Sequence, residues 1–181
     1  PFFITIPKHL LGLSASELIA DYGSVIKYIQ LPTQRVLELR YLPIAPSAVH
    51  HFEDVKHLIL LNEAVMVVSL PLLVFRLKKQ KRQNQLWRLI LPFQMLFILL
   101  LFSGFMGITN FDVLFIKFHY LFFSNMDWLF DPRTTPIILL MPENFFTVLF
   151  GLWLGFILII LLLIWGWIKL MLSIFFNKTR T

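Results

Sequence analysis

Three long apolar runs constrain this chain more than any other feature of its sequence. They cover residues 58–75, 89–108 and 145–168, and each is close to the length of about 20 residues that an α-helix needs to cross a bilayer. Inside the hydrocarbon core the backbone must satisfy its own hydrogen bonds, which favours helices. The whole chain is 58% hydrophobic and 14% charged, with a mean hydropathy of +0.78. We therefore expect an all-α integral membrane protein.

Positive charge is concentrated in two parts of the chain. Six lysines and arginines and no acidic residue lie between Arg76 and Arg88, and three more basic residues follow Ile168. The other segments hold all ten carboxylates and seven cations. Lysine and arginine accumulate in the short cytoplasmic loops of membrane proteins. We expect these two basic regions to be cytoplasmic, interpret them as a topological signal, and expect no nucleic-acid partner.

The apolar runs and the charges divide the chain into seven segments. An extracytoplasmic cap with a juxtamembrane helix (1–57) precedes a span (58–75), a basic cytoplasmic loop (76–88), a second span (89–108), an aromatic-rich extracytoplasmic loop (109–143), a third span (144–176) and a cytoplasmic tail (177–181). The apolar opening Pro1–Ile6 resembles the outer end of one more span. We therefore expect a four-helix transmembrane bundle, with three spans clearly visible here, and a small extracellular cap.

The N-terminal outer segment contains a helix start signal. Ser14 and Glu17 fit a capping box, in which each side chain satisfies a backbone donor of the first helical turn. Apolar residues then recur at helical spacing and predict an amphipathic helix of about 15 residues: Leu18, Ile19, Tyr22, Val25, Ile26 and Ile29. Farther along, Val36–Tyr41 alternates weakly between apolar and polar residues, which predicts a short strand between two prolines.

A cluster of histidines precedes the first span. Ser47 follows a proline and is a suitable N-cap for a helix that continues without a break into this span. His50, His51, Asp54 and His57 lie on that helix, and residues three or four positions apart share a face. By spacing alone, Asp54 is placed to orient any of the three histidines.

The second outer segment holds one further histidine. His119 lies on a helix expected to begin at Thr109 or Asn110 and to end near Phe123, surrounded by aromatic residues. An ionisable group next to hydrocarbon is costly and suggests a functional site. The neighbouring rings form an interfacial belt or the walls of an acyl-chain pocket, for which we select Phe118, Tyr120, Phe122, Trp128 and Phe130. Asp131 and Arg133 are a candidate ion pair.

Two kinds of chemistry suit these histidines. Imidazole accepts and returns protons near neutral pH, so His119 and a histidine of the juxtamembrane helix are candidates for general base and acid. Alternatively, His50, Asp54 and His57 have the helical spacing of metal ligands, with His119 as a further nitrogen. The absence of cysteine excludes thiol catalysis, and no serine lies in a nucleophile elbow. We favour acid–base chemistry without a metal or cofactor.

Four motifs in order resemble a known family. They are His51-Phe-Glu-Asp-Val-Lys56 before a span, Phe118-His119, Asn125-Met-Asp-Trp-Leu-Phe-Asp-Pro132 followed by Pro136-Ile-Ile, and Pro142-Glu-Asn-Phe-Phe146. Together they resemble the bacterial lipoprotein intramolecular transacylases. The resemblance implies a four-helix enzyme of the bacterial cell membrane with two catalytic histidines on its extracytoplasmic side.

The resemblance also implies a reaction. An acyl chain would move from the sn-2 ester of a lipoprotein's diacylglyceryl group to the α-amine of the same N-terminal cysteine, which gives the lyso form. His119 and His51 match the family's catalytic histidines, with His50 as a close rival of His51. Asp54, His50, Asp131 and Arg133 are expected to assist, and membrane lipids surround the site. A metal-dependent intramembrane lipid hydrolase and a non-enzymatic membrane subunit remain as alternatives.

Overall fold

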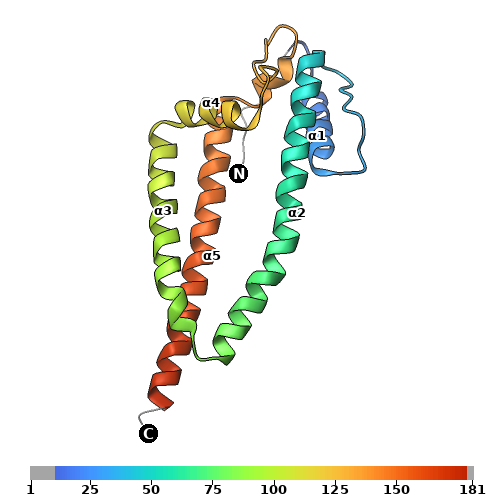
Figure 1. Cartoon of the computed structure of the whole chain (residues 1–181). Helices are drawn as coiled ribbons and strands as arrows, with labels where there is room; N and C mark the ends of the chain where they lie inside the picture. The colour runs from blue at the N-terminus through green and yellow to red at the C-terminus, as the bar shows by residue number, and fades with distance from the viewer. Residues whose placement is uncertain (1–10, 179–181) are drawn as a thin grey trace. The chain divides into compact units, whose positions relative to one another are not determined.

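The computed structural model describes residues 11–178, and Figure 1 shows the order of their elements. The helices are α1 (Ala15–Gln30), α2 (Pro46–Arg82), the 3₁₀ helix η1 (Leu86–Leu89), α3 (Ile90–Thr109), α4 (Phe111–Phe122), the 3₁₀ helix η2 (Pro136–Leu140) and α5 (Glu143–Lys178). These residues form no β-strand. The predicted all-α class is confirmed, whereas Pro1–Ile6 and the last three residues of the tail lie outside the described residues.

Three helical stretches have the length and apolar composition needed to cross a bilayer. They are α2, the continuous stretch Leu86–Gly107 formed by η1 and α3, and Glu143–Phe175 of α5. In the most apolar part of each stretch, nearly all residues are exposed on the surface of the protein, as expected for helices that lipid surrounds. The three predicted spans are therefore confirmed as helices.

The described residues form two compact units. The first contains the chain up to Met66 together with Phe115–Phe146, and the second contains Val67–Leu114 together with the chain from Thr147 onward. All the histidines predicted for the site belong to the first unit. Each unit is described separately below.

The first unit has its core between α1, the start of α2 and η2, and α1 lies beside the start of α2 in Figure 1. The capping box at the start of α1 is present: Glu17 N–H donates to Ser14 Oγ at 3.4 Å, and Ser14 N–H donates to the Glu17 carboxylate at 2.8 Å. Most of the predicted apolar stripe faces this core, but Ile19 is exposed. The buried cluster consists of Leu18, Val25, Tyr28, Leu37, Leu42, Phe52, Ile137, Leu140 and Met141.

The strand predicted at Val36–Tyr41 is wrong. This segment is irregular, and the backbone donors at its end bind a side chain rather than a neighbouring strand. The fully buried carboxylate of Asp21 accepts the backbone N–H groups of Arg40, Tyr41 and Leu42 at 2.8, 2.9 and 2.7 Å. Asp21 therefore fixes the end of the segment that connects α1 to α2.

A buried lysine holds the beginning of the same connection. The Nζ of Lys56, on α2, donates a hydrogen bond to the backbone oxygen of Gln34. It also lies 4.4 Å from the ring centroid of Tyr28 on α1, in a cation–π contact. Lys56 thus joins the first part of α2 to α1 and to the connecting segment.

We predict that Asp21→Ala loosens the connection between α1 and α2. The substitution leaves three backbone donors without their acceptor, at a cost of about 1–3 kcal/mol for each donor that stays buried. Hydrogen exchange followed by mass spectrometry should show faster exchange at residues 40–42. Asp21→Asn, which keeps one oxygen acceptor, should show a smaller increase. Unchanged exchange in the alanine variant would contradict the assigned role.

Both helices predicted around the histidines are present. α2 runs without a break from Pro46 to Arg82, as predicted, and it continues through the first part of the basic segment 76–88. α4 begins at Phe111 and ends at Phe122, close to the predicted limits. The backbone N–H of Leu114 donates to the backbone oxygen of Asn110 at 3.0 Å, which supports Asn110 as the residue that precedes the helix.

In the second unit, side chains of α5 lie against two glycines of α3. A Cβ atom at Gly104 would overlap with the side chain of Leu154, and one at Gly107 would overlap with the ring of Phe150. Small residues allow transmembrane helices to approach each other in this way. The two glycines therefore mark a place where α3 and α5 contact each other.

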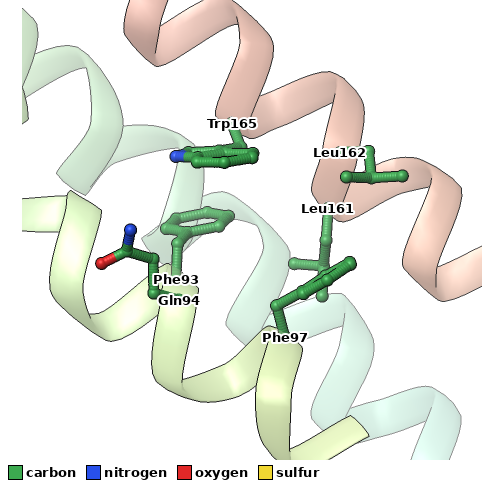
Figure 2. A pocket seen from close by; sticks show the side chains of 6 residues that line it. All are labelled: Phe93, Gln94, Phe97, Leu161, Leu162 and Trp165. Carbon is green, nitrogen blue, oxygen red and sulfur yellow. The ribbon is translucent and has the colours of Figure 1, made fainter. Parts of the chain in front are cut away.

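The same two helices also border a cavity. An apolar cavity of about 90 Å³ lies between them, and Figure 2 shows the side chains that converge on it from both helices. They are Phe93, Gln94 and Phe97 of α3 and Leu161, Leu162 and Trp165 of α5. These six side chains therefore leave an unfilled apolar space between α3 and α5.

We predict that Gly104→Leu destabilises the α3–α5 contact. The added side chain must displace Leu154, and overpacking of this kind costs about 1–3 kcal/mol. The detergent-solubilised variant should therefore melt at a lower temperature than the parent protein. Gly166→Leu is the matched control, because a Cβ atom at Gly166 meets no other atom within 4 Å. Equal melting temperatures for the two variants would contradict the prediction.

Candidate active site

His51 lies near the start of α2, before the apolar run that begins at Leu58. It is only 6% exposed and is surrounded by aromatic rings. The centroid of its ring lies 4.7 Å from that of Phe123 and 5.5 Å from that of Phe130, each in an edge-to-face arrangement. Its Nδ1 atom is buried without a hydrogen-bond partner among the described residues. A polar atom in this state is uncommon in a folded protein and suggests a partner that binds during function.

His119 lies in the last turn of α4 and is 8% exposed. Its ring contacts the rings of Phe115 and Trp128, with centroids 4.2 and 4.8 Å away. The Nδ1 of His119 lies 2.7 Å from the backbone oxygen of Phe115. Because a carbonyl oxygen only accepts, Nδ1 must be the donor and carry the hydrogen. In the neutral ring, Nε2 therefore holds the lone pair and is available to accept a proton.

The two histidines lie side by side. Their ring centroids are 5.6 Å apart and their planes are inclined by 32°. Burial, assisted by the neighbouring His119, lowers the pKa of His51 from 6.5 to about 4. Burial also lowers the pKa of His119, against the opposing effect of its hydrogen bond to Phe115. Both rings are therefore neutral at pH 7, and two neutral imidazoles can accept and pass on a proton.

Two polar contacts join α2 to the segment that follows α4. The Nδ1 of His50 lies 2.6 Å from the carboxylate of Asp127, and Asn125 donates its side-chain N–H to the carboxylate of Asp54 at 2.9 Å. The hydrogen bond that His50 donates to Asp127 raises the pKa of His50. These contacts connect the helix that carries His51 to the segment that carries Trp128.

Residues 4–146 match the model of the family described as lipoprotein intramolecular transacylase Lit. The chain belongs to this family. It is therefore a membrane-integral acyltransferase, as the motifs around His51 and His119 indicated. No match is found among curated proteins.

Solved structures of the Lit transacylase from Bacillus cereus have the same fold. One is 29% identical and has a TM-score of 0.67, and the match covers 91% of this chain and 75% of the other. A structure with a histidine-to-alanine substitution is 25% identical and has a TM-score of 0.68, over 98% of this chain and 79% of the other. A histidine-to-arginine variant, 24% identical over 93% and 75% of the two chains, has a TM-score of 0.75 and resembles this chain in fold.

The polar residues expected to assist catalysis in this Lit-family chain differ in their contacts: two bind the segment that follows α4, and two pair with each other. His50 is exposed, with 54% of its side chain accessible, so it is His51 that lies against His119. Asp54 accepts a hydrogen bond from Asn125. Asp131 and Arg133 form the predicted ion pair at 2.8 Å. Both of these side chains are well exposed, and among the described residues no hydrogen bond joins them to either buried histidine.

The aromatic residues selected for the pocket differ in their distance from the histidines. Trp128 and Phe118 contact His119, and Phe130 contacts His51. Tyr120 packs edge-to-face on Trp128, and Phe122 packs on Phe118. These last two rings therefore form a second layer around the pair.

Four residues near the histidines were not selected from the sequence. Phe115 and Phe123 counted there only as members of the aromatic belt, although they lie four positions before and after His119, on one helical face. Phe123 in fact contacts both histidines. Asn125 and Asp127 occur within the quoted motif, but nothing local links them to Asp54 and His50, which are more than 70 positions away.

The structure brings together no set of metal ligands in residues 11–178, where no group of three or more His, Cys, Asp or Glu side chains has suitable geometry. His57 is exposed on α2, while His50 and Asp54 are engaged with separate residues of the 125–127 segment. The described residues thus provide no ligand cluster for the metal-site alternative.

We predict that His51 titrates far below an ordinary histidine, near pH 4. Burial and the adjacent ring both oppose its protonation, so it should stay neutral as the pH falls through 6.5. His119→Phe keeps the site apolar but removes the neighbouring imidazole, and should raise the pKa of His51 while leaving it below 6.5. NMR titration of isotope-labelled histidine in micelles measures both values. An ordinary pKa for His51 in the parent protein would contradict the burial argument.

Proposed function

We propose that this transacylase moves an acyl chain from the sn-2 ester of a lipoprotein's diacylglyceryl-cysteine to the α-amino group of the same cysteine, and so forms lyso-lipoprotein. The observation that carries the proposal is the buried pair of neutral imidazoles, His51 and His119, whose ring centroids lie 5.6 Å apart. Ester aminolysis needs one group that removes a proton from the amine and one that returns it to the leaving oxygen.

The first step is attack by the amine on the ester carbonyl. The new N–C bond forms, the carbonyl oxygen becomes an oxyanion, and the amine loses a proton to Nε2 of His119. That nitrogen is the available acceptor, because Nδ1 of the same ring donates to the Phe115 oxygen. We therefore assign the role of general base to His119.

The second step breaks the bond between the acyl carbon and the glycerol oxygen. The oxyanion returns to a carbonyl as this bond breaks, and the glycerol oxygen takes up the proton that the amine lost. We assign the delivery of this proton to His51, which relays it from His119. Burial keeps the pKa of His51 low, so its protonated form gives up the proton readily. The reaction consumes no water and yields one amide and one hydroxyl group.

The surroundings of the pair suit a lipid substrate. Both rings are enclosed by aromatic side chains, and the exposed rings of Phe118 and Phe122 contact each other beside them at a tilt of 42°. A dry site also protects the ester from hydrolysis and strengthens the electrostatic interactions of the reaction. Because amine and ester belong to the same molecule, confinement favours the intramolecular reaction.

We further propose that the site lies on the extracytoplasmic side of the bacterial cell membrane. Five of the six basic residues of the 76–88 segment lie on the last turns of α2, which begins near His51 and ends at Arg82. By the positive-inside rule these cations are cytoplasmic, and the opposite end of the same span is then outside. Lipoproteins with a free diacylglyceryl-cysteine terminus would meet the site there.

We predict that His51→Ala and His119→Ala each abolish the formation of lyso-lipoprotein, because each removes one of the two proton-transfer groups. Mass spectrometry of the N-terminal peptide of a test lipoprotein, produced with and without this protein, measures the product directly. The acyl group should move from the glycerol to the amine without release of free fatty acid.

The matched control is His57→Ala. His57 lies on the same helix but is exposed, so its loss should leave product formation unchanged. His50→Ala tests the rival histidine and should lower the rate without abolishing product formation, because it removes the contact with Asp127 but neither proton-transfer group. Full activity in either His51→Ala or His119→Ala would overturn the proposed mechanism, and release of fatty acid would indicate a hydrolase instead.

A further inference from the structure

After Nδ1 of His51, a second buried polar atom without a hydrogen-bond partner near the site belongs to Trp128. Its indole Nε1 is buried and makes no hydrogen bond with any described residue. Indole N–H is a donor only and normally finds an acceptor when it is buried. Among the described residues of this unit, the other such atom is Nδ1 of His51. Both unpaired atoms belong to rings that contact the same third ring, His119.

The position of Trp128 is well defined by its neighbours. The centroid of its ring lies 4.8 Å from that of His119, and the two ring planes are inclined by 35°. Tyr120 packs against the Trp128 ring in an edge-to-face arrangement. The residues just before it, Asn125 and Asp127, are anchored to α2 by polar contacts. The indole N–H is therefore a donor held in a fixed, water-poor place beside the proposed general base.

We infer that the indole N–H of Trp128 donates a hydrogen bond to the carbonyl oxygen of the reacting ester and stabilises the oxyanion that forms there. This inference rests on the proposed function. The attack by the amine creates the negative charge on that oxygen within one bond of the atom under attack, so the donor must lie close to the base. Trp128 meets this requirement, whereas the Nδ1 of His119 is engaged with Phe115.

The energetic role follows from where the charge appears. An oriented donor in a water-excluded site stabilises the transition state more than the ground-state ester, because only the transition state carries the negative charge. Loss of one such donor typically lowers the rate about 10²–10³-fold. Binding of the uncharged substrate should change little.

The test replaces Trp128 by Phe, which keeps an aromatic ring beside His119 and removes the N–H. We expect the rate of lyso-lipoprotein formation to fall about 10²–10³-fold. A phosphonate analogue of the sn-2 ester, which imitates the oxyanion, should bind more weakly by a similar factor. An unreactive ether analogue should bind as it does to the parent protein. Trp153→Phe, at an exposed tryptophan of α5, should change none of these values.

Each other outcome has a definite meaning. An unchanged rate in Trp128→Phe, or an equal loss of binding for the ether and the phosphonate, overturns the inference. If Trp128→Phe does not fold, benzothienylalanine at the same position decides the matter, because its sulfur replaces the N–H in a ring of nearly the same shape. A normal rate with that residue also overturns the inference. If the parent protein itself forms no lyso-lipoprotein, the proposed function fails independently of Trp128.

Discussion

The burial of two imidazole rings among aromatic side chains is the constraint on which the rest of the site depends. Removal from water penalises the imidazolium form, and the second ring adds repulsion for His51. Each ring therefore stays neutral and keeps one nitrogen lone pair. A proton that enters such a pair is held weakly, so the arrangement suits transfer of protons rather than their storage.

Polar contacts outside the aromatic shell hold the two histidines in place. His119 is oriented by the backbone oxygen of its own helix, whereas α2 is linked through Asp54 and His50 to the segment that follows α4. Apolar packing alone permits sliding and rotation, because it has little directional preference. The hydrogen bonds of Asn125 and Asp127 supply the direction that the aromatic contacts lack.

Local patterns predicted much of this fold, and long-range contacts account for what they missed. The apolar runs and the capping box at Ser14 depend only on residues close in sequence, and the helices that they predict are present. The segment at Val36–Tyr41 has a weak strand pattern, but Asp21 binds the last two backbone donors of the segment and that of Leu42, which no local pattern reveals. The position of Phe123 beside His119 could have been predicted from helical spacing. The partners of Asp54 and His50 could not, because they lie more than 70 positions away and meet only in the folded chain.

The short segment between α4 and Phe130 contacts the helix that carries His51 and also the ring of His119. Asn125 and Asp127 bind the helix of His51, and Trp128, one residue later, packs on His119. The spacing of these three residues along the chain thus fixes the position of Trp128 relative to α2, and with it the position of His119 relative to His51. One inserted or deleted residue would uncouple the anchors from the tryptophan. The length of this segment should therefore vary far less between relatives than the length of the loop between Gln34 and Arg40, which Lys56 and Asp21 hold only at its two ends.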